Sequence, residues 1–97
     1  MVIEHTTPVG GNIFADLGFP PEEAENLHVR SKLMIEMIGI IQDRGLKQKE
    51  AAELFGVSQP RISDLKRGHI DAFTIDSLVN MLAHAGVSVE VTVRAAA

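Results

Sequence analysis

The sequence contains no cysteine, no tryptophan and no tyrosine. Without cysteine, neither a disulfide framework nor a thiolate zinc site can form, which is consistent with a reducing cytoplasm. An uninterrupted run of the roughly 20 apolar residues that a membrane span requires is also missing. The longest apolar stretch, MIEMIGII, contains Glu36, and the first residues lack the basic start and apolar core of a secretory signal. We therefore expect a soluble, cytoplasmic protein without a membrane partner.

A catalytic centre would need residues that this sequence does not group together. We find no nucleophile paired with a base, no glycine loop suited to phosphates and no cluster of metal ligands. The histidines have no partner one helical turn away and no supporting carboxylates, so surface or capping roles are expected for His5, His28, His69 and His84. The sequence predicts a protein that is not an enzyme and holds neither a metal nor a cofactor.

The chain has the length and the composition of one small globular domain, with 97 residues of which 45% are hydrophobic and 23% charged. A domain of this size buries only about two thirds of its surface on folding, so its stability is marginal without a partner. We therefore expect the protein to associate with a second copy of itself.

Positive charge is concentrated in the middle of a chain whose net charge is -4. Residues 1–28 hold five acids and no Lys or Arg, whereas residues 29–68 hold eight Lys or Arg against five acids. Residues 69–97 hold three acids and one Arg. The total charge argues against a nucleic-acid partner, but the middle block favours one.

Proline and glycine divide the chain into an arm and a series of helices. Residues 1–12 are rich in Gly, Pro and Thr and are expected to form a flexible arm. Residues 13–20 are apolar but short, so they should pack onto the body. Pro21 suits the first turn of a long helix that ends at Gly45. Apolar residues recur along this helix at helical spacing, namely Leu33, Met34, Met37, Ile38 and Ile41.

Two short helices joined by a turn follow the long helix. The first lies in LKQKEAAELFG and ends at Gly56. The second begins at Ser58, whose hydroxyl can cap the first turn, and ends at Gly68. Ile62 and Leu65 should face the core, which leaves a cationic and hydroxylic face on the outside of this second helix.

A further helix, which Thr74 should cap and Gly86 should end, leads to the strictly alternating segment VSVEVTV. Such alternation is typical of a β-strand. A lone strand leaves its backbone groups unpaired, so we expect pairing with the same strand of a second copy. The predicted interface of this homodimer consists of Val87, Val89, Val91 and Val93.

The segment QKEAAELFGVSQPRISDLKRG resembles the helix-turn-helix of the phage-repressor and Cro-like family, called the XRE type. The likeness rests on Gln48 at the start of the first helix, Ala52 where the helices cross, and Gly56 in the turn. Ile62 and Leu65 match the buried side of the second helix. This motif is known for placing its second helix in the major groove of DNA.

The resemblance extends over about residues 12–93 to short regulators of this family, many of them antitoxins of toxin–antitoxin operons. It implies a mainly all-α fold, a compact five-helix repressor-like domain over residues 13–86. Residues 87–97 would then form the dimerisation strand and the tail.

A recognition helix presents its N-terminal residues to base edges, where Gln can pair with adenine and Arg with guanine. The candidate base contacts are therefore Ser58, Gln59, Arg61 and Ser63. Phosphate contacts set the register of the protein on DNA rather than its sequence preference. The candidates for this role are Lys47, Gln48, Lys49, Lys66 and Arg67. By resemblance, Gln48 would be the phosphate clamp.

Lys47 differs from the family pattern, and Asp64 has the opposite charge to the cations of the contact face. Lys47 stands where the family often has Ser or Thr, and a lysine side chain cannot cap a helix, although it could contact a phosphate. Asp64 lies close to the contact face and would repel phosphate unless a neighbouring cation such as Arg61 or Lys66 pairs with it.

We expect a dimeric, sequence-specific DNA-binding regulator that represses its own operon by covering a palindrome. An antitoxin would in addition bind a partner toxin, and its DNA binding and toxin binding would be thermodynamically linked. The alternative is a protein-interaction module that keeps the helix-turn-helix shape but inhibits a toxin or enzyme with little DNA binding. The negative net charge and Asp64 favour this alternative.

Overall fold

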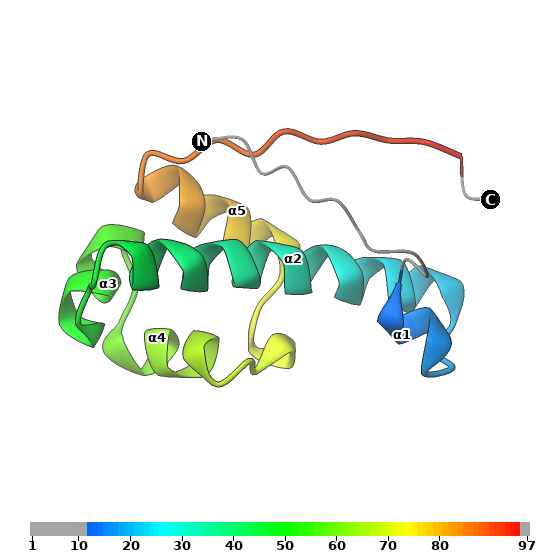
Figure 1. Ribbon diagram of the computed structural model, residues 1–97, viewed down its shortest axis with the longest axis horizontal. Coiled ribbons are helices and arrows are strands. Elements are labelled where there is room, and N and C mark those ends of the chain that lie inside the picture. Colours follow the sequence, from blue (N-terminus) through cyan, green and yellow to red (C-terminus); the bar gives the residue numbers. More distant parts are fainter. Residues whose placement is uncertain (1–11, 96–97) are drawn as a thin grey trace.

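The computed structural model describes residues 12–95, and every regular element in that range is helical (Figure 1). In chain order the elements are α1 (Ile13–Asp16), α2 (Pro21–Asp43), α3 (Gln48–Phe55), α4 (Gln59–Lys66), the 3₁₀ turn η1 (Ile70–Ala72) and α5 (Ile75–His84). The prediction of a helical domain with five α-helices is confirmed within these residues. The flexible arm was predicted for residues 1–12, and of these only Asn12 belongs to the described part of the chain.

The long helix α2 forms the axis of the molecule. In Figure 1 it spans the view, with α3 and α4 at one end and α1 at the other. Pro21 occupies its first turn, where the missing N–H costs no hydrogen bond, and Glu22 and Glu23 lie at the positive end of the helix dipole. Residues spaced three or four apart face the core, namely Ala24, Leu27, Leu33, Met34, Met37, Ile40 and Ile41.

Asn12 caps α1 and attaches it to α2. Its Oδ1 accepts a hydrogen bond of 2.9 Å from the backbone N–H of Phe14, and its Nδ2 donates to the carbonyl oxygen of Ala24 at 2.8 Å. Phe14 also meets the edge of Phe19, with ring centroids 6.1 Å apart. Helix α1 therefore lies against α2, as the sequence predicted, but Ile13, Leu17 and Phe19 stay exposed.

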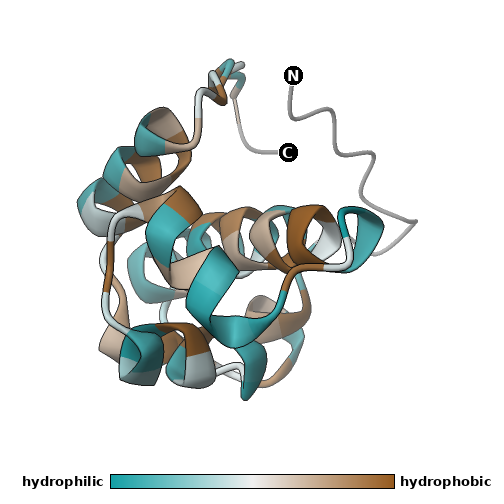
Figure 2. Cartoon of the chain, turned by 90° about the vertical axis from the view of Figure 1, so that its left-hand side faces the viewer, coloured by the Kyte–Doolittle hydropathy of each residue, from teal (hydrophilic) through white to brown (hydrophobic). Residues whose placement is uncertain are grey.

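One hydrophobic core joins α2 to α3, α4 and α5. Its largest fully buried side chains are Phe55, Phe73, Met37, Ile62, Leu65, Leu78 and Leu82. Figure 2 shows that the helices carry hydrophobic residues on part of their circumference and hydrophilic residues on the rest. Burial of their apolar stripes in this shared core stabilises α3 and α4, because helices of eight residues are too short to be stable alone.

The predicted C-terminal strand does not form in the described chain. Val87 is buried in the core and Val89 is partly buried against it, whereas Val91 and Val93 are 78% and 88% exposed. The segment after Val87 runs as an extended chain, and no neighbouring strand among residues 12–95 supplies ladder hydrogen bonds (Figure 1). The predicted strand is therefore absent from the single chain between residues 12 and 95, because alternation provides an apolar face but no partner for the backbone.

Candidate nucleic-acid interface

The start of α3 is fixed by a glutamate rather than by its N-cap residue. Lys47 occupies the N-cap position in extended conformation, and its side chain makes no capping hydrogen bond. The Glu50 carboxylate instead accepts a hydrogen bond of 2.8 Å from the backbone N–H of Lys47. This bond is one half of a capping box. The lysine ammonium group stays exposed and available to a phosphate.

The turn between α3 and α4 depends on Gly56. Its φ of 68° lies in the left-handed region, which glycine adopts at little cost. A Cβ atom at this position would lie only 2.8 Å from Cδ2 of His84. His84 comes from the end of α5, and its Nδ1–H donates to the carbonyl oxygen of Leu54 at 2.9 Å. The end of α5 thus packs over the turn, which no local sequence pattern indicated.

Two polar contacts fix the start of α4. The Ser58 hydroxyl accepts a hydrogen bond of 3.4 Å from the backbone N–H of Arg61, which confirms Ser58 as the N-cap residue. The Nε2 group of Gln48 donates to the carbonyl oxygen of Gln59 at 3.1 Å. This second contact joins the start of α3 to the start of α4. Because an amide nitrogen carries two hydrogens, Gln48 keeps a second N–H that this contact does not use.

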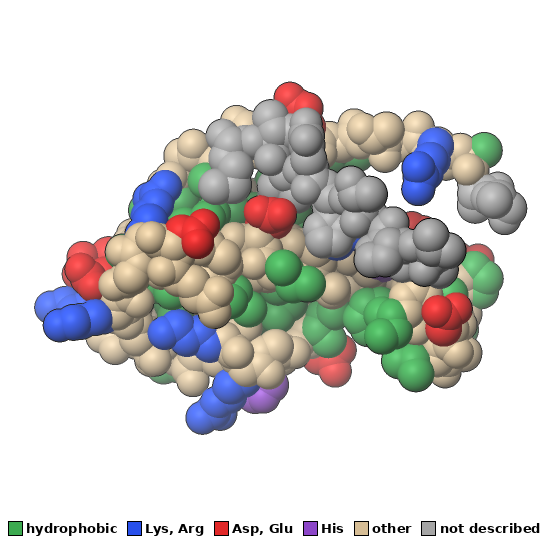
Figure 3. All heavy atoms as spheres, in the orientation of Figure 1, with side chains coloured by type: hydrophobic (Ala, Val, Ile, Leu, Met, Phe, Trp, Pro, Cys, Tyr) green, Lys and Arg blue, Asp and Glu red, His purple; other side chains and the backbone are tan. Residues whose placement is uncertain are grey.

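The predicted contacts are shared between the start of α3 and the outer side of α4. Ile62 and Leu65 are fully buried, whereas Gln59 is exposed and Ser63 is half-buried. The exposed cations at the ends of α3 and α4 are Lys47, Lys49, Lys66 and Arg67. Figure 3 shows Lys and Arg side chains along the left and lower left of the molecule, where Figure 1 places these two helices. The structure therefore brings candidate base and phosphate contacts together on one side.

Arg61 is the exception among the predicted base contacts. One of its guanidinium nitrogens donates to the carbonyl oxygen of Ala72 at 2.6 Å, and its Cζ lies 4.5 Å from the ring centroid of Phe73. The side chain is half-buried and faces η1. A charge-assisted hydrogen bond and a cation–π contact both favour this placement. Arg61 therefore connects α4 to η1.

A second arginine supports the same turn from α2. Arg30 Nη1 donates to the carbonyl oxygens of Ile70 and Phe73, at 3.1 and 3.3 Å. Its Nε donates to Asn26 Oδ1 at 2.7 Å, which orients the guanidinium group. Two of the eight Lys and Arg residues in residues 29–68, Arg30 and Arg61, thus stabilise the fold through contacts with η1 and Phe73. The charge available to a ligand is smaller than the sequence suggested.

Asp64 pairs with a residue that the sequence did not indicate. Its Oδ1 lies 3.2 Å from Nδ1 of His69, while Arg61 is bonded to Ala72. Because a carboxylate accepts only, His69 Nδ1 carries the hydrogen of this contact. The backbone N–H of His69 also donates to the carbonyl oxygen of Asp64 at 3.0 Å. The neighbour that contacts Asp64 is therefore His69, while Arg61 is engaged with Ala72.

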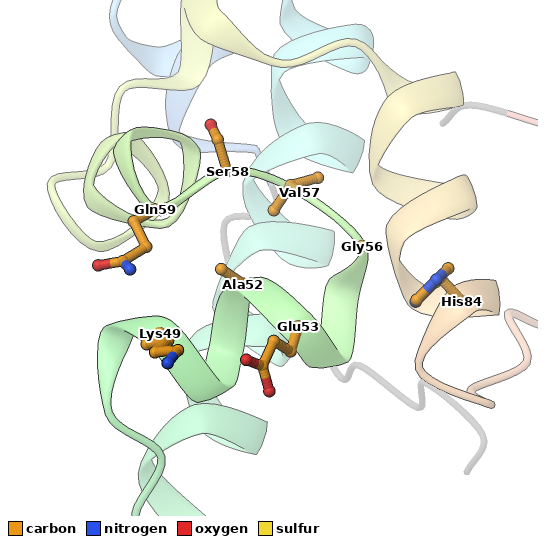
Figure 4. Close-up of a pocket in the computed structure, with 8 residues that line it drawn as sticks. All are labelled: Lys49, Ala52, Glu53, Gly56, Val57, Ser58, Gln59 and His84. Atoms are coloured by element: carbon orange, nitrogen blue, oxygen red, sulfur yellow. The ribbon is translucent and has the colours of Figure 1, made fainter.

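A shallow hollow of about 570 Å³ lies beside the turn. It is lined by Lys49, Ala52, Glu53, Gly56, Val57, Ser58, Gln59 and His84. Figure 4 shows the Gln59 side chain pointing from α4 toward α3, on the side where Ala52 and Lys49 lie. The hollow is open, so it is the inner edge of the α3–α4 surface rather than an enclosed ligand site.

Comparison with known proteins identifies this pair of helices. A family model described as a helix-turn-helix domain matches residues 13–94. The chain belongs to this helix-turn-helix family. It is 30% identical over 87 residues to an uncharacterized helix-turn-helix-type transcriptional regulator of Haemophilus influenzae, and the match covers 88% of each chain.

A solved structure described provisionally as an XRE family transcriptional regulator has the same fold. The two structures superpose with a TM-score of 0.69 and 26% sequence identity, and the match covers 76% of this chain and 83% of the other protein's chain. The resemblance to the XRE type is thereby supported, and the helix-turn-helix consists of α3, the turn at Gly56 and α4. These comparisons class the protein with helix-turn-helix transcriptional regulators.

The described part of this helix-turn-helix protein shows neither a group of three metal-ligating side chains nor a helix suited to crossing a membrane. The features of the site that the sequence reasoning missed include the contact of His84 with the turn and the inward placement of Arg61. Each joins residues that are far apart in the chain, and the residue types alone give no signal for either. Gln48 was recognised through the family motif, but its bond to Gln59 was not.

Proposed function

We propose that this protein is a sequence-specific DNA-binding transcriptional regulator whose α4 enters the major groove. Membership of the helix-turn-helix family supports the class of function. One observation carries the proposal: α4 buries Ile62 and Leu65 and leaves Gln59 exposed beside α3, near the exposed cations of both helices. In this arrangement side chains on the outer face reach base edges, while the flanking lysines meet phosphates.

The contacts of this proposal follow from exposure and chemistry. Ser58, Gln59 and Ser63 contact bases, and Gln59 discriminates most strongly because its amide can both donate to and accept from adenine. Phosphates are held by Lys47, Gln48, Lys49, Lys66 and Arg67. A base contact by Arg61 stays a prediction that requires its guanidinium group to leave the carbonyl oxygen of Ala72.

Fluorescence anisotropy tests this function on the region upstream of the protein's own gene and on a scrambled duplex, across a salt series. Preference for the upstream region and a steep loss of affinity with salt are expected. Gln59→Ala should reduce the preference by roughly 5- to 150-fold. Asn80→Ala removes an exposed amide from α5 and serves as the control. Equal, weak binding to both duplexes would contradict the proposal.

We further propose that the protein acts as a homodimer that represses its own operon by covering a palindrome. The exposed backbone of the segment after Val87 and its exposed Val91 and Val93 support pairing with the same segment of a second copy. In such a dimer the two α4 helices must lie about 34 Å apart to enter successive major grooves. A solved dimer in which they point in opposite directions would exclude this arrangement.

A second candidate function is inhibition of a partner toxin, with or without DNA binding. The end of the molecule opposite α3 and α4 favours it, because Ile13 and Leu17 are 62% and 68% exposed there. The same end of the chain carries exposed acids in α1 and the first turns of α2, namely Asp16, Glu22, Glu23 and Glu25. Such a surface suits a basic protein. Titration calorimetry with the product of a neighbouring gene, if that product is small and basic, tests this role, and the absence of binding heat excludes that partner.

A further inference from the structure

The proposed DNA surface contains an acidic side chain to which the proposed function assigns no role. Asp64 is the acid of α4, and 38% of its side chain is exposed. With about 100° of rotation per residue, Asp64 lies on the side of the helix away from Ile62. It therefore shares the outer half of α4 with its neighbour Ser63, at the edge nearest η1.

A carboxylate on this surface limits what the helix can meet in DNA. Phosphates repel it, and the backbone of duplex DNA carries a negative charge about every 1.7 Å along the axis. The floor of the major groove offers a different partner, because the N4 amino group of cytosine donates hydrogen bonds and is matched by Asp or Glu. Asp64 is thus compatible with DNA binding where α4 faces the base edges in the major groove rather than the phosphate backbone.

His69 fixes the direction of this carboxylate. The contact between His69 Nδ1 and Asp64 Oδ1 at 3.2 Å occupies one oxygen, and the backbone bond of 3.0 Å between the two residues holds them together. The second oxygen, Oδ2, is left to accept from a ligand. The carboxylate therefore has one free oxygen on a side chain whose position is already set.

We propose that Asp64 determines sequence specificity by accepting a hydrogen bond from the N4 amino group of a cytosine, while His69 holds it in place. This proposal rests on the proposed function, that is, on α4 entering the major groove. It assigns a role to the residue that otherwise counts against DNA binding. His69 is a positioning residue in this scheme, since it acts on DNA only through Asp64.

Selection from a pool of duplexes with a randomised core tests the assignment and reveals the operator in the same experiment. The wild type should prefer cytosine at one position of each half-site. Asp64→Ala should lose that preference by roughly 5- to 150-fold, yet bind unselected duplexes at least as tightly, because a charge that repels phosphate is gone. Asp64→Asn should shift the preference at the same position toward adenine, which asparagine matches.

Asp76→Ala is the matched control, because it removes the same charge from an exposed position on α5 and should leave every base preference unchanged. His69→Ala should weaken the cytosine preference without moving it to another position. Circular dichroism establishes that each variant is folded. Unchanged base preferences in both Asp64 variants would overturn the assignment and leave DNA binding intact. A wild type that enriches no sequence would instead contradict the proposed function itself.

Discussion

The helix-turn-helix of residues 48–66 and the C-terminal segment of residues 87–95 both show a regular apolar pattern, but only the first forms the predicted structure. Within the first, Ile62 and Leu65 find the core of the same chain, and each helix closes its own backbone hydrogen bonds. In the second, Val87 and Val89 reach the core while the backbone finds no partner among the described residues. A helix needs only a surface to pack on, whereas a strand also needs a neighbour.

The largest effect on stability should come from shortening a core side chain of α4. Ile62→Ala removes a fully buried side chain and should lower the free energy of unfolding by about 2–5 kcal/mol. Val93→Ala shortens a side chain that is 88% exposed and should change the free energy of unfolding by no more than about 0.5 kcal/mol. Urea unfolding followed by circular dichroism measures both. Similar losses for the two variants would mean that the C-terminal segment is as firmly packed as α4.

A somewhat smaller effect is expected at the turn. Gly56→Ala combines a left-handed φ with a Cβ that would lie 2.8 Å from His84, and should cost about 2–4 kcal/mol. Gly45→Ala has a similar φ of 59° with no atom within 4 Å, so it should cost only about 1–2 kcal/mol. The difference between their thermal unfolding midpoints isolates the contact with α5. If the two glycines respond alike, His84 moves away freely and the contact contributes nothing.

The predictable part of the fold is the part specified by neighbours in sequence. Ser58 was identified as the cap of α4, and Gly56 as the end of α3, because each acts within one turn of its own helix. The family motif added Gln48. The role of Glu50 at the start of α3 escaped prediction, although its position three residues after Lys47 is that of a capping box. Local rules therefore covered most of the helical boundaries.

Arg61 should have a moderate effect on stability. Arg61→Ala removes the hydrogen bond to Ala72 and the contact with Phe73, and should lower the free energy of unfolding by about 1.5–3 kcal/mol. Arg67→Ala, at an exposed position one residue after α4, should change it by about 0.5 kcal/mol or less. Chemical unfolding of both variants measures the difference. Wild-type stability of Arg61→Ala would show that its guanidinium group is not needed by the fold.

The direction in which the Arg61 side chain points could not be predicted from the sequence. An arginine in the first turn of a recognition helix matches a base reader in type and position, and the competing partner lies eleven residues later in the chain. Asp64 presents the same difficulty, because its partner His69 is defined by the turn after α4 rather than by helical spacing. The elements of the site were thus predictable, while the direction of its charged side chains depended on the packing of η1.

The smallest effect on folding, but a large one on association, is expected in the C-terminal segment. A variant with Val91→Asp and Val93→Asp should keep the helical fold of the wild type, because both valines are exposed in the single chain. If this segment pairs two copies, the variant should sediment as a monomer at concentrations where the wild type is a dimer. Thr92→Asp places one charge on the other face of the segment and should keep the dimer. A dimeric double variant would locate the interface elsewhere.

The bond between the Gln48 side chain and the carbonyl oxygen of Gln59 involves the backbone of α4 and not the Gln59 side chain. Replacing Gln59 by another residue therefore leaves the junction of the two helices unchanged. The same holds for other outward positions of α4, which contribute little to the core. Under the proposed function, an exchange of a few surface residues of α4 would therefore change the DNA sequence that is bound and leave the scaffold of the two helices unchanged.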